Sequence, residues 1–142
     1  HQAREIMDTY WNTAFFDPLL KGQYPGLIAR DMEEFIRAGD MDAIKAPLDF
    51  VGLQHYSPSY AYPTQDNPAG AKFGPAPQEF PVTDMGWAID PPALTECLLW
   101  VKNRYGDINL VITENGAAMA DTLSAGGTID DQKRIDYFAA YQ

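Results

Sequence analysis

Two short apolar runs with a helix between them constrain the fold of this chain most strongly. The runs cover residues 49–56 and 108–113. Residues 91–106 begin with Pro-Pro, carry an apolar stripe and end at Gly, which is typical of a helix. A strand, a helix and a second strand form a crossover, so we expect two parallel strands. Such strands are buried on both faces, and a pair alone leaves its outer edges open. The pattern predicts an α/β fold whose sheet continues in further strands or in a second copy.

Periodicity predicts three further helices. Apolar residues recur at three- and four-residue steps over residues 2–20, where Asp17-Pro18 should end or kink the helix. A second helix is expected from Pro25 to Gly39, followed by a connector, and residues 130–142 open a third. Residues 57–90 are rich in proline and show neither periodicity. We expect an ordered loop there, whose aromatic side chains form a lid or rim.

Charge and composition limit the classes of partner and of site that we expect for this chain. The formal net charge is -10, which disfavours nucleic acid and anionic membrane surfaces. No apolar run approaches about 18 residues, so no membrane span is expected. The single Cys97 is compatible with a reducing compartment, and we expect a cytoplasmic protein. His1 and His55 have no ligand spacing and no C-x-x-C or H-E-x-x-H occurs, so neither a metal site nor a cofactor is predicted.

Glu114 stands where the second apolar run ends, directly before Asn115-Gly116. Asn-Gly is a strong hairpin signal, so a tight β-turn is one interpretation. The residues that follow lack the alternation of a returning strand, which favours a loop that leads into a helix. The carboxyl ends of parallel strands are where α/β folds bind ligands. This placement predicts a functional carboxylate at the mouth of a cavity.

The first apolar run ends in Gln54, His55 and Tyr56. Alternation puts Gln54 and Tyr56 on one face, and His55 on the other, where we expect it to be packed or at the surface. On its own Tyr56 could equally be an aromatic residue of the rim. If the two strands are neighbours, its hydroxyl can reach Glu114 and donate a hydrogen bond that orients the carboxylate.

Five segments of the chain resemble glycoside hydrolase family 1, the retaining β-glucosidases. "VITENGAA" resembles the nucleophile motif of the family, and "DFVGLQHYSPSY" is similar to its D-F-x-G-x-N-Y-Y strand. "MGWAIDPPAL", "FDPLLKGQYP" and "DDQKRIDYFAAY" resemble G-W-x-x-x-P-x-x-L, D-P-x-x-x-G-x-Y-P and D-x-x-R-I-x-Y-x. The segments follow one another in the family's order and span nearly the whole chain.

The resemblance implies a partial (β/α)8 TIM barrel, with residues 1–142 as a fragment of one catalytic domain that supplies the sixth and seventh strands. It implies that Glu114 is the nucleophile, that Tyr56 is the tyrosine that hydrogen-bonds it, and that Trp87 lies near the aglycone side of the cleft. The substrate of the intact enzyme would be a β-glucoside or oligosaccharide. Gln54 replaces the family's asparagine, which alters the expected contact with the sugar, and His55 replaces a tyrosine.

Parts of the family's machinery have no counterpart in this sequence. Retaining hydrolysis needs a second carboxyl group about 5–5.5 Å from the first, and the family's T-x-N-E-P acid/base motif is absent. Other acidic residues match nothing in the catalytic set and are expected to be solvated: Glu33, Glu34, Glu79 and Glu96. We therefore expect the isolated chain to be inactive and to form a homo-oligomer through open strand edges. The alternative is a non-catalytic module that binds a sugar or a partner.

Overall fold

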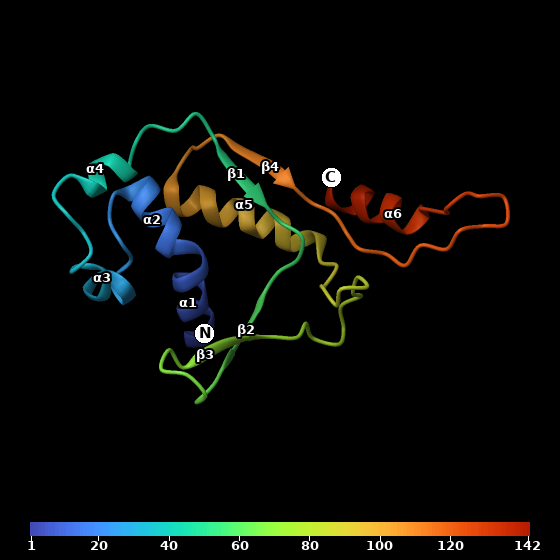
Figure 1. The fold of residues 1–142 in the computed structure, drawn as a ribbon, viewed down its shortest axis with the longest axis horizontal. Coiled ribbons are helices and arrows are strands. Elements are labelled where there is room, and N and C mark those ends of the chain that lie inside the picture. The colour runs from blue at the N-terminus through green and yellow to red at the C-terminus, as the bar shows by residue number, and fades with distance from the viewer. The chain divides into compact units, whose positions relative to one another are not determined.

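The computed structural model describes residues 1–142, which divide into two compact units. The first unit comprises His1–Asp49 and Tyr60–Gly74, and the second comprises Phe50–Ser59 and Pro75–Gln142. Figure 1 shows the elements of each. None of the helices combines the length and the apolar character that a bilayer span requires.

The first unit opens with a continuous helical segment. It consists of α1 (Gln2–Asp8), a π-helical stretch (Thr9–Thr13) and α2 (Ala14–Lys21). The helix predicted over residues 2–20 is confirmed. Of the two outcomes predicted for Asp17-Pro18, an end of the helix is excluded, because α2 continues through Pro18 and stops at Gly22, whose φ is 73°. A proline inside a helix removes one backbone hydrogen bond and kinks or breaks the helix, and here helical residues continue on both sides of the ring.

The predicted helix from Pro25 to Gly39 is shorter than expected. α3 covers Gly26–Met32, and a turn follows in which Phe35 is 66% exposed. Helices depend on packing of their apolar face more than on propensity, and this stretch has little to pack against in the unit. The predicted connector after Gly39 contains a further helix, α4 (Asp40–Ile44), which begins directly after Gly39 with its φ of 92°.

The proline-rich stretch predicted to be a loop contains a β-hairpin. β2 (Tyr60–Pro63) pairs antiparallel with β3 (Ala71–Gly74), so the prediction of one loop over residues 57–90 is wrong. Each strand has only four residues and Pro63 ends the first, which hides the alternation from a periodicity argument. The hairpin packs on the helical segment of its own unit, where the rings of Trp11 and Phe73 meet edge to face at 5.4 Å.

The second unit contains the predicted crossover. β1 (Val51–Gln54) and β4 (Leu110–Glu114) are parallel neighbours, as predicted. α5 (Pro91–Tyr105) lies in the segment of the chain that joins them, also as predicted. In Figure 1, α5 runs alongside this strand pair, and α6 (Gln132–Tyr141) follows β4. The observed fold is thus a partial α/β structure with two parallel strands and no closed barrel.

A small core holds these elements together. Its buried side chains are Leu53, Ala88, Leu94, Val101 and Tyr137. Val101 of α5 is only 1% exposed, whereas β4 is open to solvent along most of its length. The strand pair is therefore covered by helices only in part, and each strand has one edge without a partner strand.

Candidate active site

Glu114 ends β4, and its carboxylate receives hydrogen bonds from the end of β1. Gln54 Nε2 donates to Oε1 at 2.5 Å, and the Tyr56 hydroxyl donates to Oε2. A shift of register between Leu53 and Gln54 sets Gln54 opposite Glu114. The predicted contact between Tyr56 and Glu114 is confirmed, and each carboxylate oxygen has a donor of its own.

The chain leaves the strand without forming a hairpin at Asn115-Gly116. The first antiparallel bridge after β4 joins Leu123 to Ile129, several residues further on. The alternative of a tight β-turn at Glu114 is therefore wrong, and the predicted loop that leads into a helix is correct. Glu114 thus occupies the carboxyl end of a parallel strand, next to the same end of its neighbour.

The hydrogen bond stabilises the protonated form of the tyrosine. The bond to Glu114 raises the pKa of Tyr56 above its usual value of 10, and desolvation and the negative charge of the carboxylate act in the same direction. The phenol therefore remains protonated across the neutral range, as a donor must. A fixed donor of this kind limits the orientations that the carboxylate can adopt.

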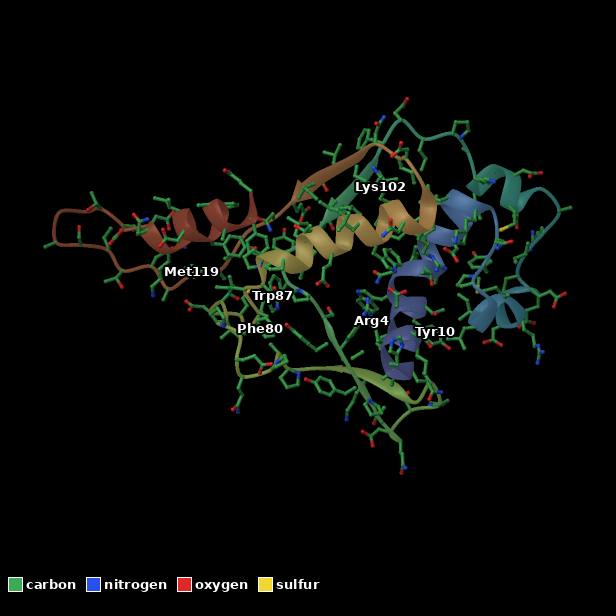
Figure 2. All side chains as sticks on the ribbon, turned by 180° about the vertical axis from the view of Figure 1, so that it is seen from behind. Arg4, Tyr10, Phe80, Trp87, Lys102 and Met119 are labelled. Atoms are coloured by element: carbon green, nitrogen blue, oxygen red, sulfur yellow. The ribbon has the colours of Figure 1, made fainter.

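Trp87 lies on a tight turn that borders this pair. Its ring centroid is 5.6 Å from that of Tyr56, with the planes tilted by 59°, and Figure 2 shows it beside the start of α5. Hydrogen bonds in both directions between Thr83 and Trp87 close the turn, and Asp84 N–H bonds to the carbonyl of Ala118 at 3.0 Å. Because Trp87 is 39% exposed, aromatic surface stays open beside the carboxylate.

His55 is packed on the other side of the strand, as alternation predicts. Its ring lies 6.5 Å from that of Tyr141, and its buried Nδ1 has no hydrogen-bond partner. Burial lowers the pKa of His55, although a backbone hydrogen bond and Asp90 oppose the shift. The side chain is therefore part of the packing beneath the strand ends.

Sequence reasoning missed two residues that connect the strand ends. Asn115 Nδ2 donates to the carbonyl of His55 at 2.8 Å and to the hydroxyl of Tyr137 at 3.1 Å. The Tyr137 hydroxyl in turn donates to the carbonyl of Tyr56 at 3.2 Å. The signal available in the sequence was the i, i+4 pair of Tyr137 and Tyr141 in the last helix, which indicates one shared, packed face.

An arginine of α6 holds the loop that follows β4. Arg134 forms ion pairs with Asp121, at 2.6 Å, and with Asp131, and its guanidinium also donates to the carbonyl of Met119 at 3.3 Å. Figure 2 shows Met119 on this loop, beside α6. The hydrogen bond to Asp121 is the largest cause of the raised pKa of Arg134. The loop is thus tied to the same helix that supplies Tyr137.

The remaining acidic residues named from the sequence lie in solvent. All four are exposed: Glu33, Glu34, Glu79 and Glu96. The structure contains no group of three or more His, Cys, Asp or Glu side chains that could hold a metal ion. The groups beside the Glu114 carboxylate are its two donors, Gln54 and Tyr56, and the indole of Trp87, which lies against Tyr56.

Comparison with known proteins identifies the family of this chain. Residues 1–142 match the sequence profile described as "Glycosyl hydrolase family 1". The chain belongs to glycosyl hydrolase family 1. Its similarity to a 1,4-beta-D-glucan glucohydrolase of Thermotoga neapolitana is 38% identity over 130 residues, which are 89% of this chain and 30% of that relative. The chain thus spans about a third of the length of the curated family members that it matches.

Solved structures of family 1 enzymes superpose on almost the whole chain. A β-glucosidase from Exiguobacterium antarcticum matches with a TM-score of 0.88 at 36% identity, over 99% of this chain and 32% of that one. The family 1 β-glucosidase from Thermotoga maritima gives a TM-score of 0.84 at 35% identity, with the same coverage. These neighbours are TIM barrels, so the two parallel strands described above correspond to part of a family 1 barrel.

Proposed function

We propose that this chain supplies the nucleophile of a retaining β-glucosidase, with Glu114 as the nucleophile and Tyr56 as the residue that orients it. In this proposal residues 1–142 belong to one catalytic barrel and provide its sixth and seventh strands. The observation that carries the proposal is the Glu114 carboxylate, held at the carboxyl end of a parallel strand by one donor on each oxygen. Membership of a family of glycosyl hydrolases supports the choice of reaction.

The reaction would proceed in two displacements. A Glu114 oxygen attacks the anomeric carbon while the glycosidic oxygen leaves with a proton from a general acid, which yields a glycosyl-enzyme. Water, deprotonated by the same general acid in its basic form, then attacks that carbon and releases Glu114. Each carboxylate oxygen keeps a lone pair for attack, because a carboxylate has about four acceptor sites and the structure uses two of them.

Gln54 and Trp87 would contact the substrate. One N–H of the Gln54 amide donates to Glu114, so its carbonyl oxygen can accept, and its second N–H can donate, a hydrogen bond with a sugar hydroxyl. Trp87 lies against Tyr56 with part of its ring open, and a flat apolar surface of this kind suits the face of a sugar or of an aryl aglycone. Gln54 therefore combines support of the nucleophile with binding of the sugar.

The general acid would come from another part of a complete barrel. The second carboxyl group of a retaining pair lies about 5–5.5 Å from the first, and Gln54, Tyr56 and Trp87, the groups beside Glu114, carry no such carboxyl. General acid catalysis contributes about 10²–10⁴-fold. We therefore expect that the 142-residue chain alone does not hydrolyse an aryl β-glucoside at a useful rate.

A chimaeric barrel tests the role of Glu114. Residues 1–142 replace the matching third of the family 1 β-glucosidase from Thermotoga maritima, and the product is assayed with an aryl β-glucoside. We expect turnover from the chimaera, and a loss of at least about 10³-fold in kcat after Glu114→Gln, because the amide cannot form a stable glycosyl ester. In Glu114→Gly the space left by the carboxylate should admit azide, which restores turnover and gives the glycosyl azide of inverted configuration.

A second measurement locates the covalent bond. A 2-fluoro-glucoside with a good leaving group slows hydrolysis of the glycosyl-enzyme, so the labelled peptide can be found by mass spectrometry, and we expect the label on Glu114. Glu79→Gln, at an exposed acidic residue, is the matched control and should leave kcat unchanged. A label on another carboxylate, or an active Glu114→Gln chimaera, would exclude this role. Saturable sugar binding by the 142-residue chain without turnover in any chimaera would favour a non-catalytic module.

A further inference from the structure

The hydroxyl of Tyr137 bridges the ends of the two strands that carry the candidate active site. It accepts a hydrogen bond from Asn115 Nδ2 at 3.1 Å and donates one to the carbonyl of Tyr56 at 3.2 Å. Asn115 directly follows Glu114 in the chain. One buried hydroxyl on α6, in a residue that is 3% exposed, therefore touches the backbone of Tyr56 and the residue next to Glu114.

A second link runs across the same ends. Asn115 Nδ2 also donates to the carbonyl of His55 at 2.8 Å, and His55 N–H donates to the carbonyl of Glu114 at 3.0 Å. The parallel pairing of β1 with β4 is irregular at this point, where the register shifts before Gln54. One backbone and one side-chain hydrogen bond thus continue the connection between the strands beyond the shift of register.

We propose that Tyr137 is a positioning residue, which acts through Asn115 and the Tyr56 carbonyl to hold the Tyr56 hydroxyl at the Glu114 carboxylate. We call the hydrogen bonds of the Tyr137 hydroxyl to Asn115 and to the Tyr56 carbonyl the tether. Only the catalytic significance of the tether rests on the function proposed above, because the bonds themselves are seen in the structure. Tyr137 does not touch Glu114 through any recorded hydrogen bond, so its influence passes through the backbone of both strand ends.

The pattern of partners separates this role from ordinary packing. The neighbouring Tyr141 is stacked on Tyr137 with centroids 4.3 Å apart, yet its hydroxyl accepts a hydrogen bond from Asp90 N–H at 3.0 Å, at the start of α5. Two tyrosines one turn apart on α6 therefore make different connections. Loss of the Tyr137 hydroxyl removes the bonds from α6 to Asn115 and to the Tyr56 carbonyl, whereas loss of the Tyr141 hydroxyl removes the bond to Asp90, which precedes α5.

The ionisation of Tyr56 reports the tether directly. Its phenol is influenced by Glu114 and, to a smaller extent, by Tyr137. In the 142-residue chain with ¹³C-labelled tyrosine, NMR titration should give a wild-type pKa above 10 for Tyr56, a value closer to 10 in Tyr137→Phe, and an unchanged value in Tyr141→Phe. Asn115→Ala should lower it as Tyr137→Phe does, although it keeps the Tyr137 hydroxyl.

Each outcome decides the proposal. It is overturned if Tyr137→Phe and Asn115→Ala leave the Tyr56 pKa unchanged, if Tyr141→Phe lowers it as much, or if the wild-type value is already 10. The titration requires no turnover, so the role of Tyr137 can be confirmed even if the chimaera is inactive and the proposed function fails. Conversely, an active chimaera would not support the role of Tyr137 if the titration shows no change. In an active chimaera, Tyr137→Phe should lower kcat by about tenfold, below the roughly 100-fold expected for a 1 Å misplacement, with KM altered less.

Discussion

Gly52, in the middle of β1, should not tolerate a methyl group while the side chain of Thr113 lies next to it. A Cβ at Gly52 would stand 3.0 Å from Thr113 Cγ2 and 3.5 Å from its Oγ1. The first distance is too short for two carbon atoms, which prefer about 3.5–4.0 Å. Thr113 cannot rotate away freely, because its Oγ1 donates to the carbonyl of Leu53 at 3.2 Å. Since Thr113 precedes Glu114, any adjustment displaces the strand end at the candidate site.

Two opposing contributions set the magnitude of Gly52→Ala. Overpacking costs about 1–3 kcal/mol, and rotation of Thr113 instead would forfeit a hydrogen bond that contributes about 0.5–1.5 kcal/mol. Alanine in place of glycine at a compatible backbone position stabilises by about 0.4–1 kcal/mol through the unfolded chain, and Gly52 does not have a positive φ. We therefore expect a net loss of about 1 kcal/mol in the free energy of unfolding.

In a chain that carries Thr113→Ser, the effect of Gly52→Ala on the free energy of unfolding should change sign. Serine lacks Cγ2 but keeps the hydroxyl that donates to Leu53, so the clash disappears while the hydrogen bond stays. In this background Gly52→Ala should stabilise the chain by about 0.4–1 kcal/mol. Urea unfolding followed by tryptophan fluorescence gives all four free energies of the double-mutant cycle. The same effect of Gly52→Ala in both backgrounds would refute the reasoning, because the contact with Cγ2 would then carry no energy.

Further expectations concern packing, pH and association. Val101→Ala should lower the free energy of unfolding by about 2 kcal/mol, because two methyl groups are removed from a residue that is only 1% exposed. Leu99→Ala on the same helix, at a residue 51% exposed, should cost under about 1 kcal/mol. Equal losses of the two variants in urea unfolding would argue against the core described here. Burial lowers the pKa of His55 below 6.5, so the unfolded chain binds more protons than the folded one as the pH falls through that value, and stability should decrease there; His55→Gln should remove this part of the decrease, and identical pH profiles of the two chains would contradict it. The purified chain should self-associate through the open edges of β1 and β4, which light scattering would show as a mass above 15.8 kDa; a monomer at all concentrations would speak against this.

Local patterns in the sequence were sufficient to predict the crossover and one contact of the candidate site. The apolar runs and the Pro-to-Gly helix between them predict parallel neighbours, and alternation within the first run then puts Tyr56 on the face from which it reaches Glu114. Both inferences depend on short-range regularities that hold whatever the rest of the chain does. The hairpin of β2 and β3 escaped prediction because its strands are too short to show a period, and its pairing becomes visible only when the strands meet.

What the sequence by itself determined is therefore the set of elements in the second unit and the position of Glu114 at a strand end. The tertiary structure alone decided that Asn115 turns back to the carbonyl of His55 and that Tyr137, 22 residues further along, closes the link to Tyr56. The physical reason is that hydrogen bonds between distant residues depend on the path of the loop that joins them. Nothing in the spacing of Asn115 and Tyr137 encodes that path, whereas the ion pairs of Arg134, which hold the loop on α6, act only once the chain has folded.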